Sequence, residues 1–322
     1  MPTSSAMTAH AFWIIWPGQG ELRPEDLPAP GPAEHRLRML ASGVSRGTEA
    51  LVFAGRVPPS QYQTMRAPRM AGDFPFPVKY GYCAVAMTER GQRVFVLHPH
   101  QDHFNAPAAM CIPIPDAVPT QRAVLAANME TALNLLWDAA PLPGERMLVV
   151  GAGVLGLLTA ALLARIPAAR VTVVDLDPAR ATIAREFGCA FATPDTAPAE
   201  QELIVHCSAS ESGLRLCLAS AAFEARIIEA SWYADAAPAI PLGEAFHASR
   251  LRLTASQVGA IAPIMRGRRT HAERLATALS LLNDANFDAL LQGPTRFEDL
   301  PSAMPSILRP GGLCHVITYG DA

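Results

Sequence analysis

The feature that most constrains the fold is a set of glycines placed between a strand-like stretch and a helical stretch. Residues 147–150 are continuously apolar, and Gly151, Gly153 and Gly156 then follow with the spacing G-x-G-x-x-G. Glycines with this spacing permit a tight turn, a close approach of a ligand to the main chain, and close packing of a helix on a strand. We therefore expect a strand, a turn and a helix that together hold a diphosphate group.

The residues around this turn add the rest of a dinucleotide site. The helix is expected to begin at Val154 and Leu155, whose region offers unpaired main-chain N–H groups to an anion. Asp175 ends the next strand-like run, where a carboxylate accepts hydrogen bonds from both ribose hydroxyls of an adenosine. A 2′-phosphate would meet like charge there, so the sequence favours NAD over NADP. Arg180 lies close by and leaves NADP as the alternative.

From residue 147 onward the chain alternates between strand-like and helical patterns. The strand-like runs are continuously apolar, as expected when helices cover both faces of a parallel sheet. We therefore predict an α/β fold with a doubly wound parallel sheet of the Rossmann type. Ser208 and Ser231 follow later strands, at the edge where such sheets bind ligands, and are expected to contact the nicotinamide side. The predicted strands are 147–150, 171–175, 203–207, 226–229 and 251–256, and the predicted helices are 154–165, 178–187, 213–222 and 271–283.

The part of the chain before residue 120 has a different character, because short strand-like runs alternate with turn-rich segments. The runs are 12–15, 35–42, 79–87 and 93–97, and a helix is predicted over 121–140. Residues 1–10 are expected to be disordered. We expect three segments: a β-rich substrate domain over 1–120, an NAD-binding domain with its junction helix over 121–286, and a return to the β-rich domain over 287–322.

Composition excludes several classes of partner. The 322-residue chain has a net charge of −3 and 17% charged residues, which gives it no strong attraction to nucleic acid or to an anionic membrane. No apolar run is long enough to span a bilayer, and no secretory leader is recognisable, so a cytoplasmic protein is expected. The six cysteines include no C-x-x-C pair and are interpreted as free, mostly buried thiols.

Two short motifs in the first part of the chain resemble those of the medium-chain dehydrogenase/reductase superfamily. Residues 43–49 (G-V-S-R-G-T-E) are similar to the turn before that family's active site, and residues 81–86 (G-Y-C-A-V-A) are similar to its G-H-E-x-x-G motif. The resemblance implies a GroES-like β-rich domain joined to the Rossmann domain, an NAD-dependent oxidoreductase acting on a small molecule, and a homodimer. The first motif and the following G-Y also resemble the bacteriochlorophyllide a dehydrogenase branch.

The zinc-dependent members of this superfamily hold their catalytic ion at three places that differ here. Ser45, Tyr82 and residues 126–128 stand at those places, and a hydroxyl and a phenol are poor zinc ligands. We therefore expect no zinc. Without a metal, hydrogen-bond donors must stabilise the reacting oxygen, and Ser45, Thr48 and Tyr82 are the candidates. The alternative is that Ser45 and Thr48 cap a turn and that Tyr82 serves packing.

Three functions are compatible with these patterns. The first is zinc-independent hydride transfer between NAD(H) and a secondary alcohol, a ketone or an activated double bond, in a cleft between two domains. The second is a protein that binds NAD without catalysis. The third is a metal-dependent hydrolase that uses His98, His100, Asp102 and His103, which match the pattern H-x-H-x-D-H. The segment 51–79 is interpreted as either a substrate lid or a surface loop, and a bulky substrate is compatible with its aromatic and basic residues.

Overall fold

The computed structural model describes residues 7–320, which form two compact units. The first unit combines the described residues up to Ala127 with those from Leu275 onward, and the second unit spans Asn128–Arg274. The division expected from the sequence, at residues 120 and 286, stays a prediction about where independent domains begin and end. Across residues 7–320, no helix combines the length and the apolar character needed to cross a lipid bilayer.

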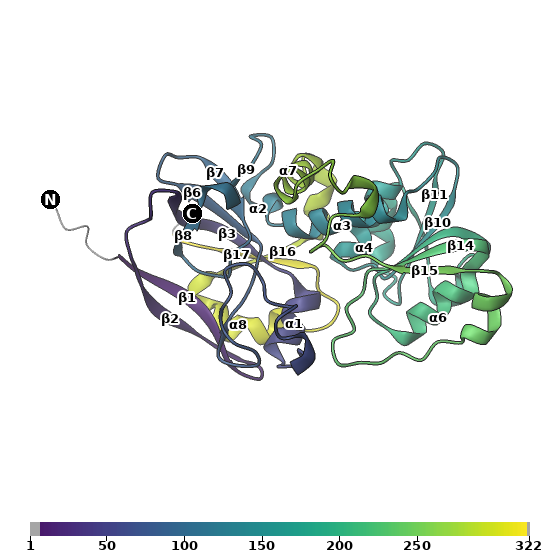
Figure 1. The fold of residues 1–322 in the computed structure, drawn as a ribbon, viewed down its shortest axis with the longest axis horizontal. Coiled ribbons are helices and arrows are strands. Elements are labelled where there is room, and N and C mark those ends of the chain that lie inside the picture. The colour runs from purple at the N-terminus through teal and green to yellow at the C-terminus, as the bar shows by residue number, and fades with distance from the viewer. Residues whose placement is uncertain (1–6, 321–322) are drawn as a thin grey trace. The chain divides into compact units, whose positions relative to one another are not determined.

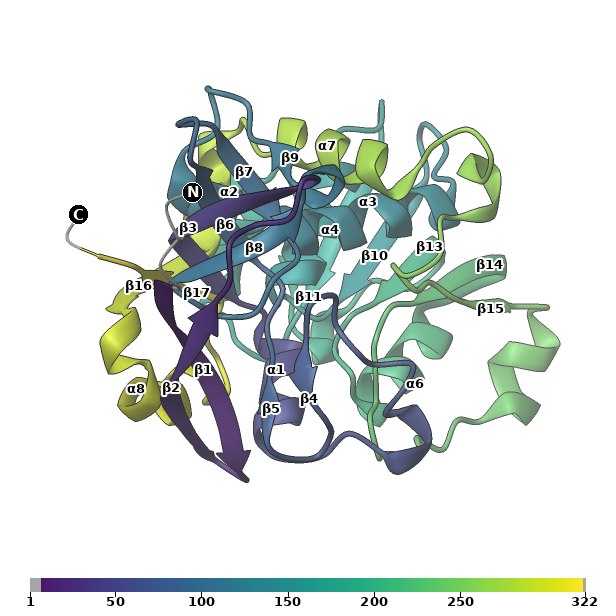
Figure 2. The same ribbon diagram turned by 60° about the vertical axis from the view of Figure 1, so that its left-hand side comes forward.

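The first unit is built from two β-sheets (Figures 1 and 2). One sheet has the order β2-β1-β5-β4, with the long β1–β2 hairpin visible in Figure 2. Its strands are β1 (Met7–Trp16), β2 (Gln19–Leu27), β4 (Ala71–Gly72) and β5 (Val78–Lys79). The other sheet has the order β16-β17-β3-β6-β7-β9, and β8 also pairs with β3. Its strands are β3 (Glu34–Val44), β6 (Ala84–Thr88), β7 (Arg93–Val96), β8 (His103–Pro107), β9 (Ile112–Pro113), β16 (Leu291–Arg296) and β17 (Cys314–Thr318).

The last strand of the chain belongs to the sheet of the first unit. β17 runs antiparallel to β3, with His315 opposite Val44 and Thr318 opposite Ala41. The helices in or next to this unit are α1 (Arg46–Phe53), α2 (Thr120–Ala123), α3 (Ala126–Ala139), α7 (His271–Leu281) and α8 (Leu300–Ile307). Helix α1 begins directly after β3 and therefore carries residues 46–49 at the end of a central strand.

The second unit confirms the predicted doubly wound parallel sheet. Its strand order is β12-β11-β10-β13-β14-β15, and every neighbouring pair is parallel (Figure 1). The order reverses between β10 and β13, which is the place where open sheets of this type bind ligands. The elements are β10 (Arg146–Val150), α4 (Val154–Leu163), β11 (Arg170–Val174), α5 (Arg180–Glu186), β12 (Ala190–Ala192), β13 (Gln201–His206), α6 (Glu211–Ser220), β14 (Ala221–Glu229) and β15 (Arg252–Ala255).

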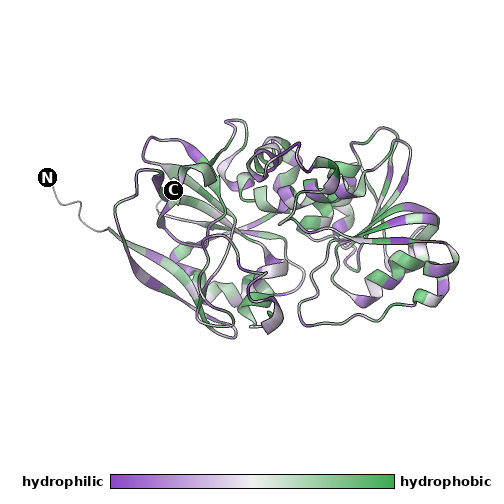
Figure 3. Cartoon of the chain, in the orientation of Figure 1, coloured by the Kyte–Doolittle hydropathy of each residue, from purple (hydrophilic) through white to green (hydrophobic). Residues whose placement is uncertain are grey.

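The core of the second unit consists of the apolar strand residues on which the sequence prediction depended. Leu148, Ile204 and Ile227 come from three neighbouring strands and are each fully buried. Figure 3 shows hydrophobic segments along the strands of both units. Burying these side chains contributes about 1.5–3 kcal/mol each to the free energy of folding, which fixes the strand ends that carry the polar site residues.

The structure contains elements that were not predicted, such as β2, α1 and α8, and it also differs from the predicted elements in the following details. The predicted helix 121–140 is interrupted between α2 and α3, where Val124 and Leu125 are fully buried, so packing overrides the helical pattern. The predicted strand 79–87 is divided because Gly81 has a φ of +129°. Residues 7–10 begin β1 and pair with β2, so the prediction of disorder is wrong for them, and residues 1–6 lie outside the described residues. The short strand β12 was not predicted.

Candidate functional site

The glycine turn after β10 is shaped by two close approaches that only glycine allows. Gly151 has a φ of +106°, and a Cβ there would lie 2.8 Å from the main-chain nitrogen of Ser208. A Cβ on Gly156 would overlap the carbonyl oxygen of Gly151. The turn therefore folds back tightly on the first turn of α4, as predicted from the glycine spacing.

Gly153 differs from these two glycines because its missing side chain faces open space. No atom lies within 4 Å of the Cβ position at Gly153, which is the residue that caps α4. The following residues, Val154 and Leu155, are partly exposed, and the first N–H groups of a helix have no acceptor within the helix. Open space in front of unpaired N–H groups is what a diphosphate requires, so this turn fits the dinucleotide predicted for it.

Asp175 is fixed directly beside this turn. Its Oδ2 accepts a hydrogen bond of 2.6 Å from the main-chain N–H of Ala152, and its Oδ1 accepts one of 2.9 Å from that of Asp177. Each carboxylate oxygen keeps a further lone pair with which to accept a sugar hydroxyl. The nearby Arg180 forms an ion pair of 3.4 Å with Asp177.

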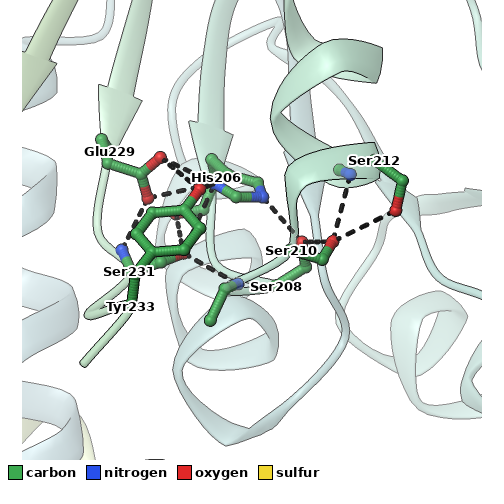
Figure 4. Close-up of polar contacts among 9 residues, drawn as sticks. His206, Ser208, Ser210, Ser212, Glu229, Ser231 and Tyr233 are labelled. Atoms are coloured by element: carbon green, nitrogen blue, oxygen red, sulfur yellow. Dashed lines mark hydrogen bonds and ion pairs between the residues drawn. The ribbon is translucent and has the colours of Figure 1, made fainter. Parts of the chain in front are cut away.

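Ser208 and Ser231 are brought together at the neighbouring strand ends by one histidine (Figure 4). His206 is the last residue of β13, and its Nε2 lies 2.6 Å from Ser208 Oγ. Its Nδ1 lies 2.8 Å from Oε2 of Glu229, which is the last residue of β14 and the register partner of His206. Ser231 donates its N–H to Glu229 Oε1 at 2.7 Å, and its Oγ accepts the N–H of Ala209 at 3.0 Å.

Glu229 is held in its charged form by these contacts. Burial acts to raise the pKa of its carboxyl, but the hydrogen bond and charge of His206 and the bonds from Ser231 outweigh burial and lower the pKa below its usual value. The hydroxyl of Tyr233 donates a further hydrogen bond of 3.1 Å to Oε2. Burial and the charge of Glu229 raise the pKa of Tyr233, which therefore stays a donor.

A second group of predicted residues lies in the first unit. The phenol of Tyr82 donates a hydrogen bond of 2.7 Å to Oγ of Ser45, so these two predicted residues are in direct contact. Ser45 is the residue that precedes α1 and is 8% exposed, while Tyr82 is partly exposed. Thr48 lies in the first turn of α1, and the hydrogen bonds that join Ser45 and Tyr82 do not include it.

A buried acidic residue fixes the main chain at Ser45. Glu49 Oε1 accepts a hydrogen bond of 2.7 Å from the N–H of Ser45, and Glu49 Oε2 lies 3.0 Å from Nε2 of His100. The other ring nitrogen of His100 lies 2.7 Å from Ser42 Oγ, which in turn lies 2.8 Å from the hydroxyl of Tyr319. All of these side chains are buried, so Ser45 rests on a chain of polar contacts that runs into the core of the unit.

Burial and nearby groups raise the pKa values of the phenol and thiol groups in this region, so these groups stay protonated. Burial raises the pKa of Tyr82 well above its usual value, and Tyr80, Cys83 and Glu49 raise it further, against a smaller opposite effect of the Ser45 hydrogen bond. Burial likewise raises the pKa of the adjacent Cys83, together with the charges of Cys314 and Glu49. Tyr82 is therefore a hydrogen-bond donor at neutral pH rather than a base.

All six cysteines are free and five of them are buried, which confirms the prediction made for them.

Aromatic rings connect the segment 51–79 to Tyr82. Tyr62 packs on Phe74 at a centroid distance of 5.6 Å, Phe74 packs on Tyr80 at 5.8 Å, and Tyr80 meets Tyr82 edge to face at 6.1 Å. The segment itself includes the short strands β4 and β5. The ring of Tyr82 is thus held from the side of this segment while its hydroxyl is held by Ser45.

Comparison with known proteins agrees with this architecture. No protein-family model matches the chain. L-galactonate-5-dehydrogenase of Escherichia coli K12 is 27% identical over 193 residues, which are 52% of this chain and 54% of that protein, so the match spans about half of the length of this relative. An alcohol dehydrogenase from E. coli CFT073, solved with NADH, superposes with a TM-score of 0.76 at 17% identity and covers 98% of this chain and 100% of its own.

A dehydrogenase from Sinorhizobium meliloti 1021, described as zinc-binding and solved with NADP, superposes with a TM-score of 0.77 at 14% identity. It covers 97% of this chain and 99% of its own. The chain therefore has the fold of these dehydrogenases, and about half of its sequence is similar to that of L-galactonate-5-dehydrogenase. The predicted combination of a Rossmann sheet with a GroES-like β-rich unit is confirmed.

The residues that the resemblance matches to the superfamily's zinc positions are poor zinc ligands. Ser45 and Tyr82 offer a hydroxyl and a phenol of raised pKa that are hydrogen-bonded to each other, whereas zinc prefers thiolate, imidazole and carboxylate. Residues 126–128 provide two buried alanines and one asparagine. Within residues 7–320, no three His, Cys, Asp or Glu side chains are grouped so that they could hold a metal.

The side chains of the sequence H-x-H-x-D-H do not gather around one point: Asp102 and His103 contact each other, while His98 and His100 have other partners. The ring of His98 stacks on Phe104 at 3.7 Å, and burial lowers the pKa of His98 to about 3. His100 contacts Glu49, while Asp102 accepts hydrogen bonds from the main chain of His10 and His103. A metal-dependent hydrolase at this sequence therefore gains no support from the structure.

Sequence reasoning missed the residues whose role depends on strand register. His206 and Glu229 were not among the predicted site residues, and the structure shows that they are hydrogen-bonded to each other. The available signal was that two apolar runs, ending at residues 206 and 229, each finish on a titratable side chain. Glu49 was not among the predicted site residues either, and its bond to the Ser45 N–H lies at the start of helix α1.

The two glycines of the turn give a paired prediction. Gly156→Ala places a methyl group against the Gly151 carbonyl and should lower the free energy of unfolding by about 1–3 kcal/mol. Gly153→Ala fills only open space, so its stability should change by less than about 1 kcal/mol while its affinity for NADH falls roughly tenfold. Thermal melts and NADH fluorescence titrations measure both effects. Unaltered NADH affinity in Gly153→Ala would show that the open space does not receive the dinucleotide.

Proposed function

We propose that this chain is a zinc-independent, NAD-dependent oxidoreductase that transfers a hydride between the nicotinamide and a secondary alcohol or ketone, or an activated double bond. The observation that carries the proposal is the 2.7 Å hydrogen bond from Tyr82 to Ser45, because two neutral donors stand where zinc-dependent relatives place metal ligands. Support for the cofactor comes from the glycine turn and from Asp175 beside it.

The residues proposed to hold the dinucleotide all lie at one edge of the sheet of the second unit. Gly151, Gly153 and Gly156 shape the turn, and the N–H groups near Val154 and Leu155 face the diphosphate. Asp175 holds the ribose, and its charge disfavours a 2′-phosphate, which is our reason for preferring NAD to NADP. Ser208 and Ser231 offer hydroxyls on the nicotinamide side. When bound, the nicotinamide supplies or accepts the hydride.

Ser45 and Tyr82 are proposed to stabilise the oxygen of the substrate. Tyr82 donates its proton to Ser45 Oγ, and the Ser45 hydroxyl is proposed to donate in turn to the carbonyl oxygen of the substrate once that oxygen is bound. As negative charge grows on that oxygen, both hydrogen bonds of the relay become stronger. The raised pKa of Tyr82 opposes complete loss of its proton, so the pair acts by donation. Glu49 keeps the main chain of Ser45 in place.

The surroundings of Tyr82 favour a bulky substrate. The rings of Tyr62, Phe74 and Tyr80 form an apolar cluster beside Tyr82, and Tyr62 is the ring of this cluster that is partly exposed, so a planar or apolar substrate is proposed to pack on Tyr62. We also propose that the protein is a homodimer, since β15 is an edge strand of the six-stranded sheet and exposes Arg252 and Thr254. An unpaired strand edge favours addition of another strand.

Turnover on a panel of secondary alcohols and bulky ketones tests the proposed function. Oxidation or reduction coupled to NAD(H) should be measurable by absorbance of NADH, and dialysis against a chelator should leave the rate unchanged because no zinc takes part. Elemental analysis of the same sample serves as the control for residual metal. Stoichiometric zinc whose removal abolishes turnover would contradict the proposal, and NADH binding without turnover on any substrate would indicate a non-catalytic NAD-binding protein.

Tyr82→Phe tests the hydroxyl relay. Removing the donor to Ser45 should lower kcat by roughly 100-fold, with a much smaller change in KM, because the lost bond matters most when charge forms on the oxygen. Tyr80→Phe is the matched control, since its hydroxyl makes only a 3.4 Å bond to the carbonyl of Met65 and should leave kcat unchanged. Equal rates for wild type and Tyr82→Phe would assign Tyr82 to packing alone.

A further inference from the structure

A serine, a histidine and a glutamate in the second unit have the geometry of a nucleophile, a base and an orienting acid. Ser208 Oγ lies 2.6 Å from His206 Nε2, and Nδ1 of the same ring lies 2.8 Å from Glu229 Oε2 (Figure 4). The parallel register of β13 and β14 places His206 directly beside Glu229, and the turn after β13 returns Ser208 to the other ring nitrogen. Binding a nicotinamide does not require this linear arrangement.

The acceptors around His206 favour one arrangement of its proton. Glu229 accepts hydrogen bonds from the Ser231 N–H and the Tyr233 hydroxyl and is ionised, so Nδ1 of His206 must donate to it. A neutral imidazole with its proton on Nδ1 has its lone pair on Nε2, which faces the hydroxyl of Ser208. Ser210 Oγ accepts the N–H of Gly213 at 3.1 Å and lies 2.8 Å from Ser208 Oγ. Ser210 can therefore donate its own proton to Ser208, while Ser208 donates to His206.

The base is shielded while the nucleophile is accessible. His206 is 0% exposed, whereas Ser208 is exposed at the edge of the sheet. Gly213, in the first turn of α6, makes this possible, because a Cβ there would overlap Ser208 Oγ and lie 2.7 Å from His206 Nε2. Helix α6 begins directly after Ser210, whose Oγ accepts the N–H of Gly213, and the remaining N–H groups of its first turn are the donors proposed for a developing oxyanion.

We propose that Ser208, His206 and Glu229 form an acyl-transfer triad that cleaves small, uncharged carboxylic esters. Ser208 Oγ attacks the ester carbonyl carbon while its proton moves to His206 Nε2. The bond to the leaving alcohol then breaks, and the alcohol departs with that proton. Water, activated by His206, hydrolyses the acyl group on Ser208 and restores the hydroxyl, with no net oxidation or reduction. The carboxylates of Glu229 and Glu211 disfavour an anionic ester.

This activity is separate from the proposed hydride transfer but shares Ser208 with it. If the nicotinamide side of NADH covers Ser208, as proposed above, bound NADH protects the serine from acylating reagents. NADH binding and ester cleavage at Ser208 would then exclude each other, and the chain would cleave esters only in its cofactor-free state.

The test is covalent labelling of the purified full-length protein with a fluorophosphonate probe, followed by peptide mass spectrometry and by p-nitrophenyl acetate hydrolysis. Wild type should carry one adduct on Ser208, and NADH should slow the labelling. Ser208→Ala should lose the adduct, and His206→Gln or Glu229→Gln should slow labelling by at least about 100-fold. Ser212→Ala, which alters an exposed serine in the first turn of α6, is the matched control and should label like wild type.

Folding and cofactor binding are measured on the same samples, because His206 and Glu229 are integral to the sheet. Glu229→Gln keeps the size of the side chain and Ser208→Ala alters an exposed residue, so thermal melts should show that both variants are folded. Wild type that stays unlabelled at Ser208, or that is labelled no faster than Glu229→Gln, overturns the triad. If the same wild-type sample still binds NADH, the proposed oxidoreductase function is unaffected by that result.

Discussion

One hydrogen bond joins the two parts of the cofactor site, namely the 2.6 Å contact between the carboxylate of Asp175 and the main-chain N–H of Ala152. It is possible only because β10 and β11 are neighbouring parallel strands and because Gly151 turns the chain sharply after β10. The carboxylate stabilises the turn by a charge-assisted bond, and the turn fixes the carboxylate beside the place where a sugar would lie. The cofactor proposal depends on this mutual arrangement more than on any single residue.

The proposed substrate site at Ser45 and Tyr82 depends on a different kind of interaction. A metal would stabilise a developing alkoxide with its charge, whereas Ser45 and Tyr82 can offer only hydrogen bonds, whose strength depends on exact placement. The buried pair of Glu49 and His100 provides that placement through the main chain of Ser45. Burial, and to a smaller degree the charge of Glu49, raises the pKa of Tyr82 and Cys83, which keeps both groups protonated.

The sequence predicted the features that depend on neighbouring residues. The strand, glycine turn and helix were predicted because each glycine has a local steric reason, and the contact of Ser45 with Tyr82 agrees with the pairing of their two motifs by resemblance. The interruption between α2 and α3 was not predicted, since the burial of Val124 and Leu125 is decided by tertiary packing. The grouping of Thr48 with the other two donors is not supported by any hydrogen bond in the structure.

Contacts that join distant parts of the sequence were beyond prediction. His206 meets Glu229 through strand register, and His100 meets Glu49 through the fold of the first unit. Only the three-dimensional structure shows that each histidine is hydrogen-bonded to a glutamate. The histidine sequence near residue 100 thereby changes from a suggested metal site to a structural support for Ser45.

The most direct test of the cofactor site is the calorimetric affinity of wild type and Asp175→Asn for NADH and NADPH. Wild type should bind NADH at least tenfold more tightly than NADPH, since a 2′-phosphate would face the carboxylate. Asp175→Asn keeps an oxygen for the Ala152 N–H but loses the charge, so that preference should fall to nearly equal affinities. Wild type without affinity for either nucleotide, or a preference unchanged in Asp175→Asn, would contradict the account.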